Sequence, residues 1–188
     1  MPDRFKSLKE MQTDIDASKP GAVSPKEMLR LELLTSFEKY TCVMFKTQYH
    51  RSFIVAEHHK KMFEALQKVV DGDCKRLIIN MPPRYSKTEV VVKSFMSWCF
   101  ALNPKCRFLH LSYSDILVND NSDTVRTIMA EQLYTTLFPR SALASEKGSA
   151  KRWKTKAGGE LYAVSTQGQV TGFGAGNVDI DPEIDKMD

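Results

Sequence analysis

The sequence predicts an α/β fold in which helices flank a parallel sheet. Two short apolar runs of strand length, 76–81 and 107–112, are each followed by a helix-like stretch. The connections are short, as in proteins that alternate strands and helices around a parallel sheet covered on both faces. Hydrophobic residues (42%) and charged residues (27%) occur in ordinary proportions for a globular protein, and 188 residues suffice for one well-buried domain.

The N-terminal part of the chain predicts a polar arm followed by helices. Residues 1–23 are polar and predict a flexible arm. Ser24 and Glu27 form a capping box with proline at the first helical position, so a largely buried helix begins there and runs toward Phe45. A second helix, with one apolar stripe, is predicted over about 56–71.

The rest of the chain alternates strands and helices. Residues 76–81 predict a first strand, which a proline pair ends, and 87–102 predict the helix that follows. Residues 107–112 predict a second strand, and a helix is expected over about 122–134. A loop that carries a cluster of cations leads to a last strand, predicted over 160–166.

Charge is distributed unevenly along this chain, whose net charge is +4. Cations crowd one segment: Lys147, Lys151, Arg152, Lys154 and Lys156. Acids crowd the C-terminal end: Asp179, Asp181, Glu183, Asp185 and Asp188. This asymmetry permits the basic segment to bind a polyanion.

Cellular location follows from what the sequence lacks. No run approaches the ~18 apolar residues that span a bilayer, and the first ten residues lack the apolar core of a secretory signal. The four cysteines, at positions 42, 74, 99 and 106, have no CxxC spacing, which argues against a zinc site or a disulfide framework. We therefore expect a cytosolic protein with no membrane partner.

The segment between the first strand and its helix, MPPRYSKT, has features of a phosphate-binding loop. Such a loop needs inward backbone N–H groups, a lysine on the β- and γ-phosphates, and a hydroxyl on Mg²⁺ at a helix N-terminus. Lys87 and Thr88 supply the lysine and the hydroxyl. The pattern GxxxxGKT fails at both glycines, because Met81 and Ser86 occupy those positions. A plain strand-to-helix turn, with a surface lysine and a capping threonine, therefore remains an alternative.

The order of several motifs resembles the ATPase domain of phage large terminases. The strings RLIINMPPRYSKTEVVV, SWCFALNP, RFLHLSYS and LYTTLFP follow one another, with FIVAEHHKKMFEAL upstream and GGELYAVSTQGQVTGFGAG downstream. In that family a deviant Walker A loop of the form PPRxGKS follows an apolar strand, and the likeness covers about residues 28–176. Serine at position 86 departs from the family's glycine, and it costs about 1 kcal/mol if its φ is positive.

The resemblance implies an additional-strand P-loop NTPase fold that binds ATP and Mg²⁺ and pumps double-stranded DNA into a capsid. It implies a homo-oligomeric ring on the portal protein, a small terminase subunit as partner, and a location in the host cytoplasm. Residues 24–176 would form the N-terminal part of the ATPase domain, and 177–188 an acidic tail or the start of an insertion. No apolar run ends in a Walker B acid, since NVDIDP at 177–182 is too polar. We expect that acid and the nuclease domain to lie beyond Asp188.

The resemblance also assigns roles around the loop. Lys87 would contact the β- and γ-phosphates and Thr88 would coordinate Mg²⁺. Arg84 would stabilise charge on the transferred phosphoryl group, or else pair with a carboxylate. His59 and its neighbour would lie where related motors touch adenine, or would simply start a helix. The other expected nucleotide-binding residues are Pro83, Tyr85, Ser86 and Glu89, with Glu89 favouring the helix N-terminus.

The cationic segment is the candidate DNA interface. Lys151, Arg152, Trp153 and Lys154 interleave an aromatic ring with cations, as in contacts to a phosphate backbone, and a solvated loop is the alternative. Fold analogy with helicase-like motors adds the region of Asn121 and Ser122.

Two other functions stay open. One is a helicase-like, nucleic-acid-dependent ATPase. The other is a non-catalytic P-loop relic that binds nucleotide or a partner without turnover, which the two missing glycines and the missing Walker B acid favour for these 188 residues.

Overall fold

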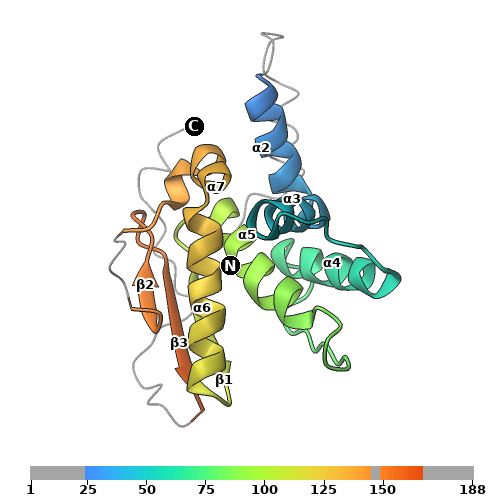
Figure 1. Cartoon of the computed structure of the whole chain (residues 1–188), viewed down its shortest axis with the longest axis vertical. Coiled ribbons are helices and arrows are strands. Elements are labelled where there is room, and N and C mark those ends of the chain that lie inside the picture. The colour runs from blue at the N-terminus through green and yellow to red at the C-terminus, as the bar shows by residue number, and fades with distance from the viewer. Residues whose placement is uncertain (1–23, 145–148, 167–188) are drawn as a thin grey trace.

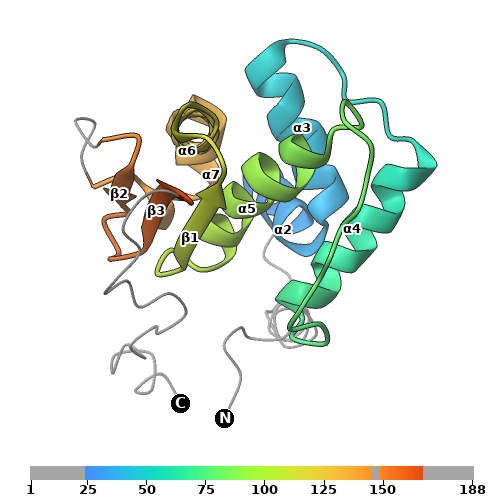
Figure 2. The same ribbon diagram turned by 90° about the horizontal axis from the view of Figure 1, so that it is seen from below.

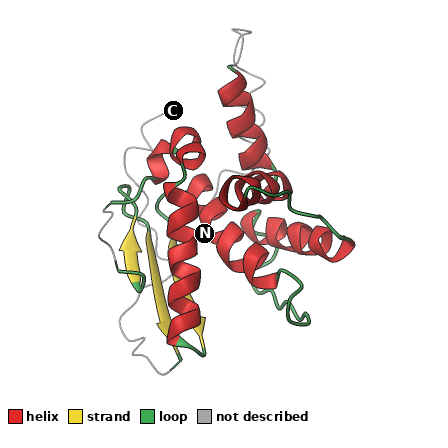
Figure 3. Ribbon diagram, in the orientation of Figure 1, coloured by secondary structure: helices red, strands yellow, loops and turns green. Residues whose placement is uncertain are grey.

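The computed structural model describes residues 24–144 and 149–166. The arm predicted over 1–23, Lys147 and the acidic segment at 177–188 lie outside the described residues. In Figure 3 the three strands gather on one side of the molecule, and the helices of the N-terminal part lie on the other.

The first helix ends earlier than its apolar pattern predicts. Helix α2 spans Pro25–Thr35 and begins as expected, with the Ser24 hydroxyl accepting a hydrogen bond from Glu27 N. Ser36 then adopts an extended conformation (φ −133°) and caps a separate helix, α3 (Phe37–Tyr49). Helix α4 (Glu57–Val70) confirms the second predicted helix, and its apolar stripe is buried.

The strand predicted over 76–81 is wrong. No described strand pairs with this segment, although Ile79 and Met81 pack against the core. The side chain of Ile78 is 93% exposed, and Leu77 is also exposed. An apolar run becomes a strand only where a neighbouring strand satisfies its backbone, and the described part of the chain places none beside it.

The helix after the loop is confirmed, with an unexpected first half. Residues Thr88–Ser94 form a π-helical element, η1, and Phe95–Leu102 continue as α5. Helix α5 is almost completely buried, and Trp98 donates its indole N–H to Leu33 O over 2.9 Å. Because π-helical turns are rare and often mark functional sites, the start of this helix is notable.

The sheet has three strands in the order β1-β3-β2. Strand β1 (Arg107–Ser112) runs parallel to β3 (Glu160–Ser165), and both confirm predicted strands. Strand β2 (Arg152–Lys154) is antiparallel to β3 and lies in the segment that was expected to be a loop. The chain therefore has an α/β fold with a small mixed sheet.

Helix α6 (Asp115–Ala130) lies along one face of this sheet (Figures 1 and 2). It begins seven residues before the predicted start at 122, because Ser114 caps it by accepting from Leu117 N. The short elements α7 (Gln132–Leu137) and η2 (Pro139–Ser141) follow. Among the described elements we see no helix laid along the opposite face, so cover on both faces remains a prediction.

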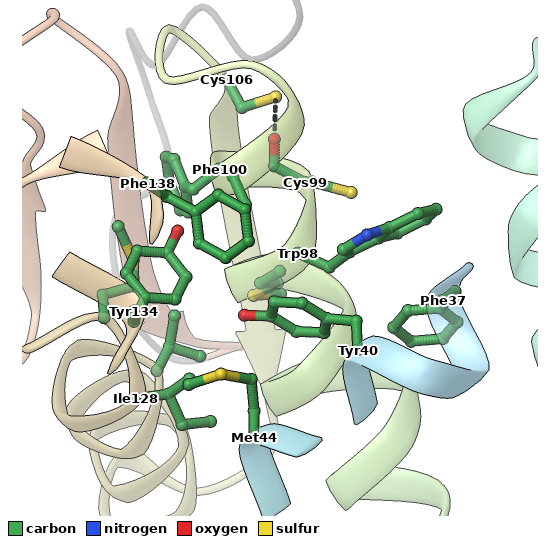
Figure 4. Packing of buried hydrophobic residues seen from close by; sticks show 14 of the residues in the cluster. Phe37, Tyr40, Met44, Trp98, Cys99, Phe100, Cys106, Ile128, Tyr134 and Phe138 are labelled. Atoms are coloured by element: carbon green, nitrogen blue, oxygen red, sulfur yellow. Dashed lines mark hydrogen bonds between the residues drawn. The ribbon is translucent and has the colours of Figure 1, made fainter. Parts of the chain in front are cut away.

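An aromatic core joins the helices to the sheet side of the molecule (Figure 4). The rings of Phe37 and Trp98 lie 4.9 Å apart. Tyr40 donates to Ser97 Oγ over 2.8 Å, and Tyr134 donates to Ser97 O over 3.0 Å. These contacts fix α5, and with it the helix that starts at the loop. No helix in the described ranges has both the length and the hydrophobicity that a membrane span requires.

Candidate functional site

The backbone of the loop before η1 has the conformation of an anion-binding nest. Arg84 (φ 70°) and Ser86 (φ 57°) both adopt left-handed conformations, which side chains other than glycine rarely adopt. Lys87, directly after Ser86, is right-handed (φ −53°, ψ −53°). Successive residues of opposite hand turn their N–H groups toward a common point, where an anion can bind. Strained residues of this kind concentrate at functional sites.

A small cavity of about 280 Å³ lies against this loop. Its lining residues are Pro82, Pro83, Arg84, Ser86, Lys87, Thr88, Glu89 and Lys93. The structure therefore brings six of the predicted loop residues to one cavity, while Tyr85 and His59 do not line it. A larger hollow of about 550 Å³, between the start of α2 and η2, contains none of the predicted site residues.

The cavity is positively charged. Three cations line it, at positions 84, 87 and 93, against one carboxylate, that of Glu89. Lys93 was not predicted, and its only sequence signal is its position four residues after Glu89 on a helix. An excess of cations at a helix N-terminus suits a phosphate group.

Glu89 is held by two partners from different elements. Lys93 Nζ lies 3.0 Å from Glu89 Oε2, and the Tyr49 hydroxyl at the end of α3 lies 3.4 Å from the same oxygen. The ion pair is mostly buried, with the two side chains 17% and 20% exposed. Burial lowers the pKa of Lys93, but its interactions with Glu89 and Tyr49 together outweigh burial, so the net shift is upward. Glu89 is therefore one member of a charged cluster, in addition to lying in the first turn of η1 as expected.

His59 is buried at the start of α4. Its Nδ1 accepts a hydrogen bond from Ala56 N over 2.9 Å, so the ring proton resides on Nε2, which has no partner among the described residues. Burial and the neighbouring His58 lower the pKa of His59, which keeps the ring neutral. His59 therefore helps to start helix α4, which was the alternative to a contact with adenine.

The histidine pair nevertheless lies next to the loop. The ring of His58 packs edge-on against Tyr85, with centroids 5.5 Å apart, and lies tilted against the ring of His59, with centroids 3.9 Å apart. Tyr85 therefore connects the loop to α4. Nε2 of His58 also lacks a partner among the described residues. Both Nε2 atoms are buried, so neither faces the loop cavity.

The residues of the loop fit Mg²⁺ that is bound largely through phosphate. In the described part of the chain, no group of three His, Cys, Asp or Glu residues gathers. Mg²⁺ commonly keeps several waters and binds through substrate phosphates with few protein ligands. Thr88, in the first turn of η1 and lining the cavity, would be the protein ligand.

One residue of the predicted DNA interface, Trp153, is buried. Trp153 is only 4% exposed and donates its indole N–H to Ser122 Oγ over 2.9 Å. Because side chains alternate across a strand, β2 turns Trp153 into the core while Arg152 and Lys154 face outward. Neither Trp153 nor the buried Ser122 is available to DNA. Asn121 instead lies 3.4 Å from His110 Nε2, between α6 and β1.

Arg152 has a structural partner that sequence reasoning missed. The buried carboxylate of Glu160 lies 2.5 Å from Arg152 Nε and 3.2 Å from the guanidinium of Arg107. The three residues come from β2, β3 and β1, so the ion pairs fasten all three strands together. Lys151 and Lys154 remain exposed, and they are the part of the predicted interface that can still meet DNA.

Comparison with known proteins gave no further assignment. No family model matches the chain, and no match was found among curated proteins or solved structures.

Proposed function

We propose that this chain is the ATP-binding part of a viral DNA-packaging motor of the large-terminase type. The observation that carries the proposal is the left-handed conformation of Ser86, directly before Lys87 and Thr88 at a helix start. A plain turn has no reason to keep a serine there at a cost of about 1 kcal/mol or more. A phosphate-binding loop does have a reason to keep it, because a left-handed residue at this position directs the backbone N–H groups at the anion.

Different residues of the loop would bind different parts of the nucleotide. The N–H groups around Ser86 and the ammonium group of Lys87 would bind phosphate oxygens. Arg84 has no carboxylate partner among the described residues and lines the cavity, which favours a role on the phosphoryl group over a structural ion pair. Thr88 would hold the Mg²⁺ that neutralises charge on the phosphates. His58 and His59 would meet the base only if their buried Nε2 atoms became exposed when nucleotide binds.

The DNA-related part of the proposal depends on the resemblance and on exposed charge. Lys154 at the end of β2 and Lys151 just before it are exposed, and they would contact the phosphate backbone without reading sequence. Assembly into a ring on the portal protein, a small terminase subunit as partner and action in the host cytoplasm belong to the same proposal.

A second candidate function is nucleotide binding without turnover. It is favoured by Glu89, because this residue is already paired with Lys93 and no other carboxylate among the described residues lines the loop cavity. A carboxylate held in this way is poorly placed to orient an attacking water.

Binding and turnover should be measured on the same samples. A fluorescent ATP analogue reports affinity, and release of inorganic phosphate reports turnover. We expect Lys87→Ala to weaken binding at least tenfold while circular dichroism stays unchanged, and Lys154→Ala to leave binding unchanged. Equal binding by Lys87→Ala and the parent would contradict the phosphate-loop assignment. We expect negligible hydrolysis by the 188-residue chain, and turnover on the order of 1 s⁻¹ or faster would exclude the second candidate.

A further inference from the structure

Lys93 is a mostly buried cation that neither the loop motif nor the resemblance accounts for. We propose that Lys93 is a second phosphate-contacting lysine, which Glu89 and Tyr49 hold in reserve until a polyphosphate enters the loop cavity. The inference rests on the proposed nucleotide-binding function and goes beyond it by naming the residue that would distinguish a triphosphate from a shorter phosphate chain.

Lys93 lies at the loop cavity, next to Glu89. Lys93 and Glu89 both line the loop cavity, and their charged atoms lie 3.0 Å apart. Both side chains are mostly buried, unlike the exposed Lys39–Glu32 pair, so the interaction is poorly screened by water. Lys93 comes more than one turn after Lys87, which places it deeper along η1 than the motif lysine.

The charge of the loop cavity favours an exchange of partners by Lys93. Arg84 and Lys87 together with Glu89 give the cavity a net charge of +1. Lys93 raises this net charge to +2. A nucleoside triphosphate carries roughly four negative charges, far more than the single charge of Glu89. Since Coulomb attraction scales with charge at a given distance, an incoming polyphosphate would compete with Glu89 for the Lys93 ammonium group.

Tyr49 makes the exchange of partners possible. A buried carboxylate that loses its only cation is strongly destabilised. The Tyr49 hydroxyl lies 3.4 Å from Glu89 Oε2 and can donate to it whether Lys93 is present or not. Burial and the Glu89 charge raise the pKa of Tyr49, so its hydroxyl keeps the proton that this hydrogen bond needs.

Tripolyphosphate, ATP and ADP are suitable probes, with affinity measured by calorimetry on the full chain. We expect Lys93→Met to weaken tripolyphosphate and ATP binding about tenfold, and ADP binding less. Glu89→Gln should strengthen ATP binding severalfold, because it releases Lys93. The variant that carries both changes completes the comparison. We expect Lys93→Met to lower ATP affinity more when Glu89 is already replaced by Gln than it does in the parent. Lys39→Met, which breaks the exposed pair with Glu32, is the matched control and should change nothing.

The outcomes separate this inference from the proposed function. If Lys87→Ala abolishes binding while Lys93→Met and Glu89→Gln both stay within twofold of the parent, then Lys93 is purely structural and the inference is overturned. If Lys87→Ala binds ATP as the parent does, the phosphate loop itself is disproved, and the role of Lys93 falls with it. Thermal unfolding of each variant shows that a loss of affinity is not a loss of fold.

Discussion

Trp153 donates its indole N–H to the hydroxyl of Ser122 over 2.9 Å, and this bond joins the middle of β2 to the sheet-facing side of α6. The indole ring also packs near Phe100 of α5, with centroids 5.3 Å apart. Trp153 is therefore a core residue, although cations flank it in the sequence. The neighbouring Arg152 and Lys154 are exposed on the surface.

We expect Trp153→Ala to lower the free energy of unfolding by about 3–5 kcal/mol, because it empties a large buried site and leaves Ser122 without its donor. Urea unfolding followed by circular dichroism measures this. Lys154→Ala, the adjacent exposed change, should stay within about 0.5 kcal/mol of the parent. A small effect of Trp153→Ala would mean that the ring is not part of the core.

Ser86→Gly should stabilise the fold. Removing a side chain from a left-handed position relieves about 1–2 kcal/mol of strain, and the greater freedom of unfolded glycine offsets part of it, so a net gain of up to about 1 kcal/mol is expected. Ser94→Gly is the comparison, since Ser94 is helical (φ −68°) and buried, so the change should cost at least about 0.5 kcal/mol. The two changes should thus have opposite signs in thermal unfolding, and the same sign would argue against the left-handed loop.

Glu160 should make stability depend on pH in the acid range. Burial raises the pKa of Glu160, but hydrogen bonds from Arg152 and Arg107 outweigh it and bring the pKa below its ordinary value of 4.5. The charged form therefore stabilises the fold above about pH 4.5, and this contribution is lost as the pH falls through the lower folded-state pKa.

Glu160→Gln should cost about 2–3 kcal/mol at pH 7, a value reduced by the half-exposed position of Arg152. Unfolding measured from pH 7 to pH 3 should show the difference from the parent shrinking toward acid. The exposed Glu64→Gln change serves as the control and should remain close to the parent. A difference that stays constant with pH would mean that the ion pairs do not set the titration of Glu160.

Lys151 and Lys154 should supply most of any contact between this segment and DNA. Changing both to alanine should flatten the slope of log affinity against log salt by up to ~1.8 units, at ~0.9 per lost phosphate contact. ATP affinity should not change, because neither lysine lines the loop cavity. Changing the exposed Lys60 and Lys61 of α4 instead removes the same charge elsewhere. If both double variants lower the slope equally, the effect reflects net charge and not a binding site.

The sequence by itself determined those features that local patterns encode. Capping at Ser24, the apolar stripe of α4 and the strand-length runs at 107–112 and 160–166 each reflect interactions among residues close in the chain, so they could be predicted. The placement of Lys87 and Thr88 at a helix start was also predictable, since a proline pair and a helical run fix the boundary.

Only the tertiary structure decided which side chains meet and which way each one faces. Tyr49 and Glu89 are 40 residues apart and Arg107 and Glu160 are 53 apart, so no local pattern pairs them. Trp153 faces inward because β2 pairs with β3. Residues 76–81 have no described strand beside them, so their backbone has no strand partner and they do not join the described sheet. Burial and backbone pairing depend on contacts between distant segments, and those contacts exist only once the chain has folded.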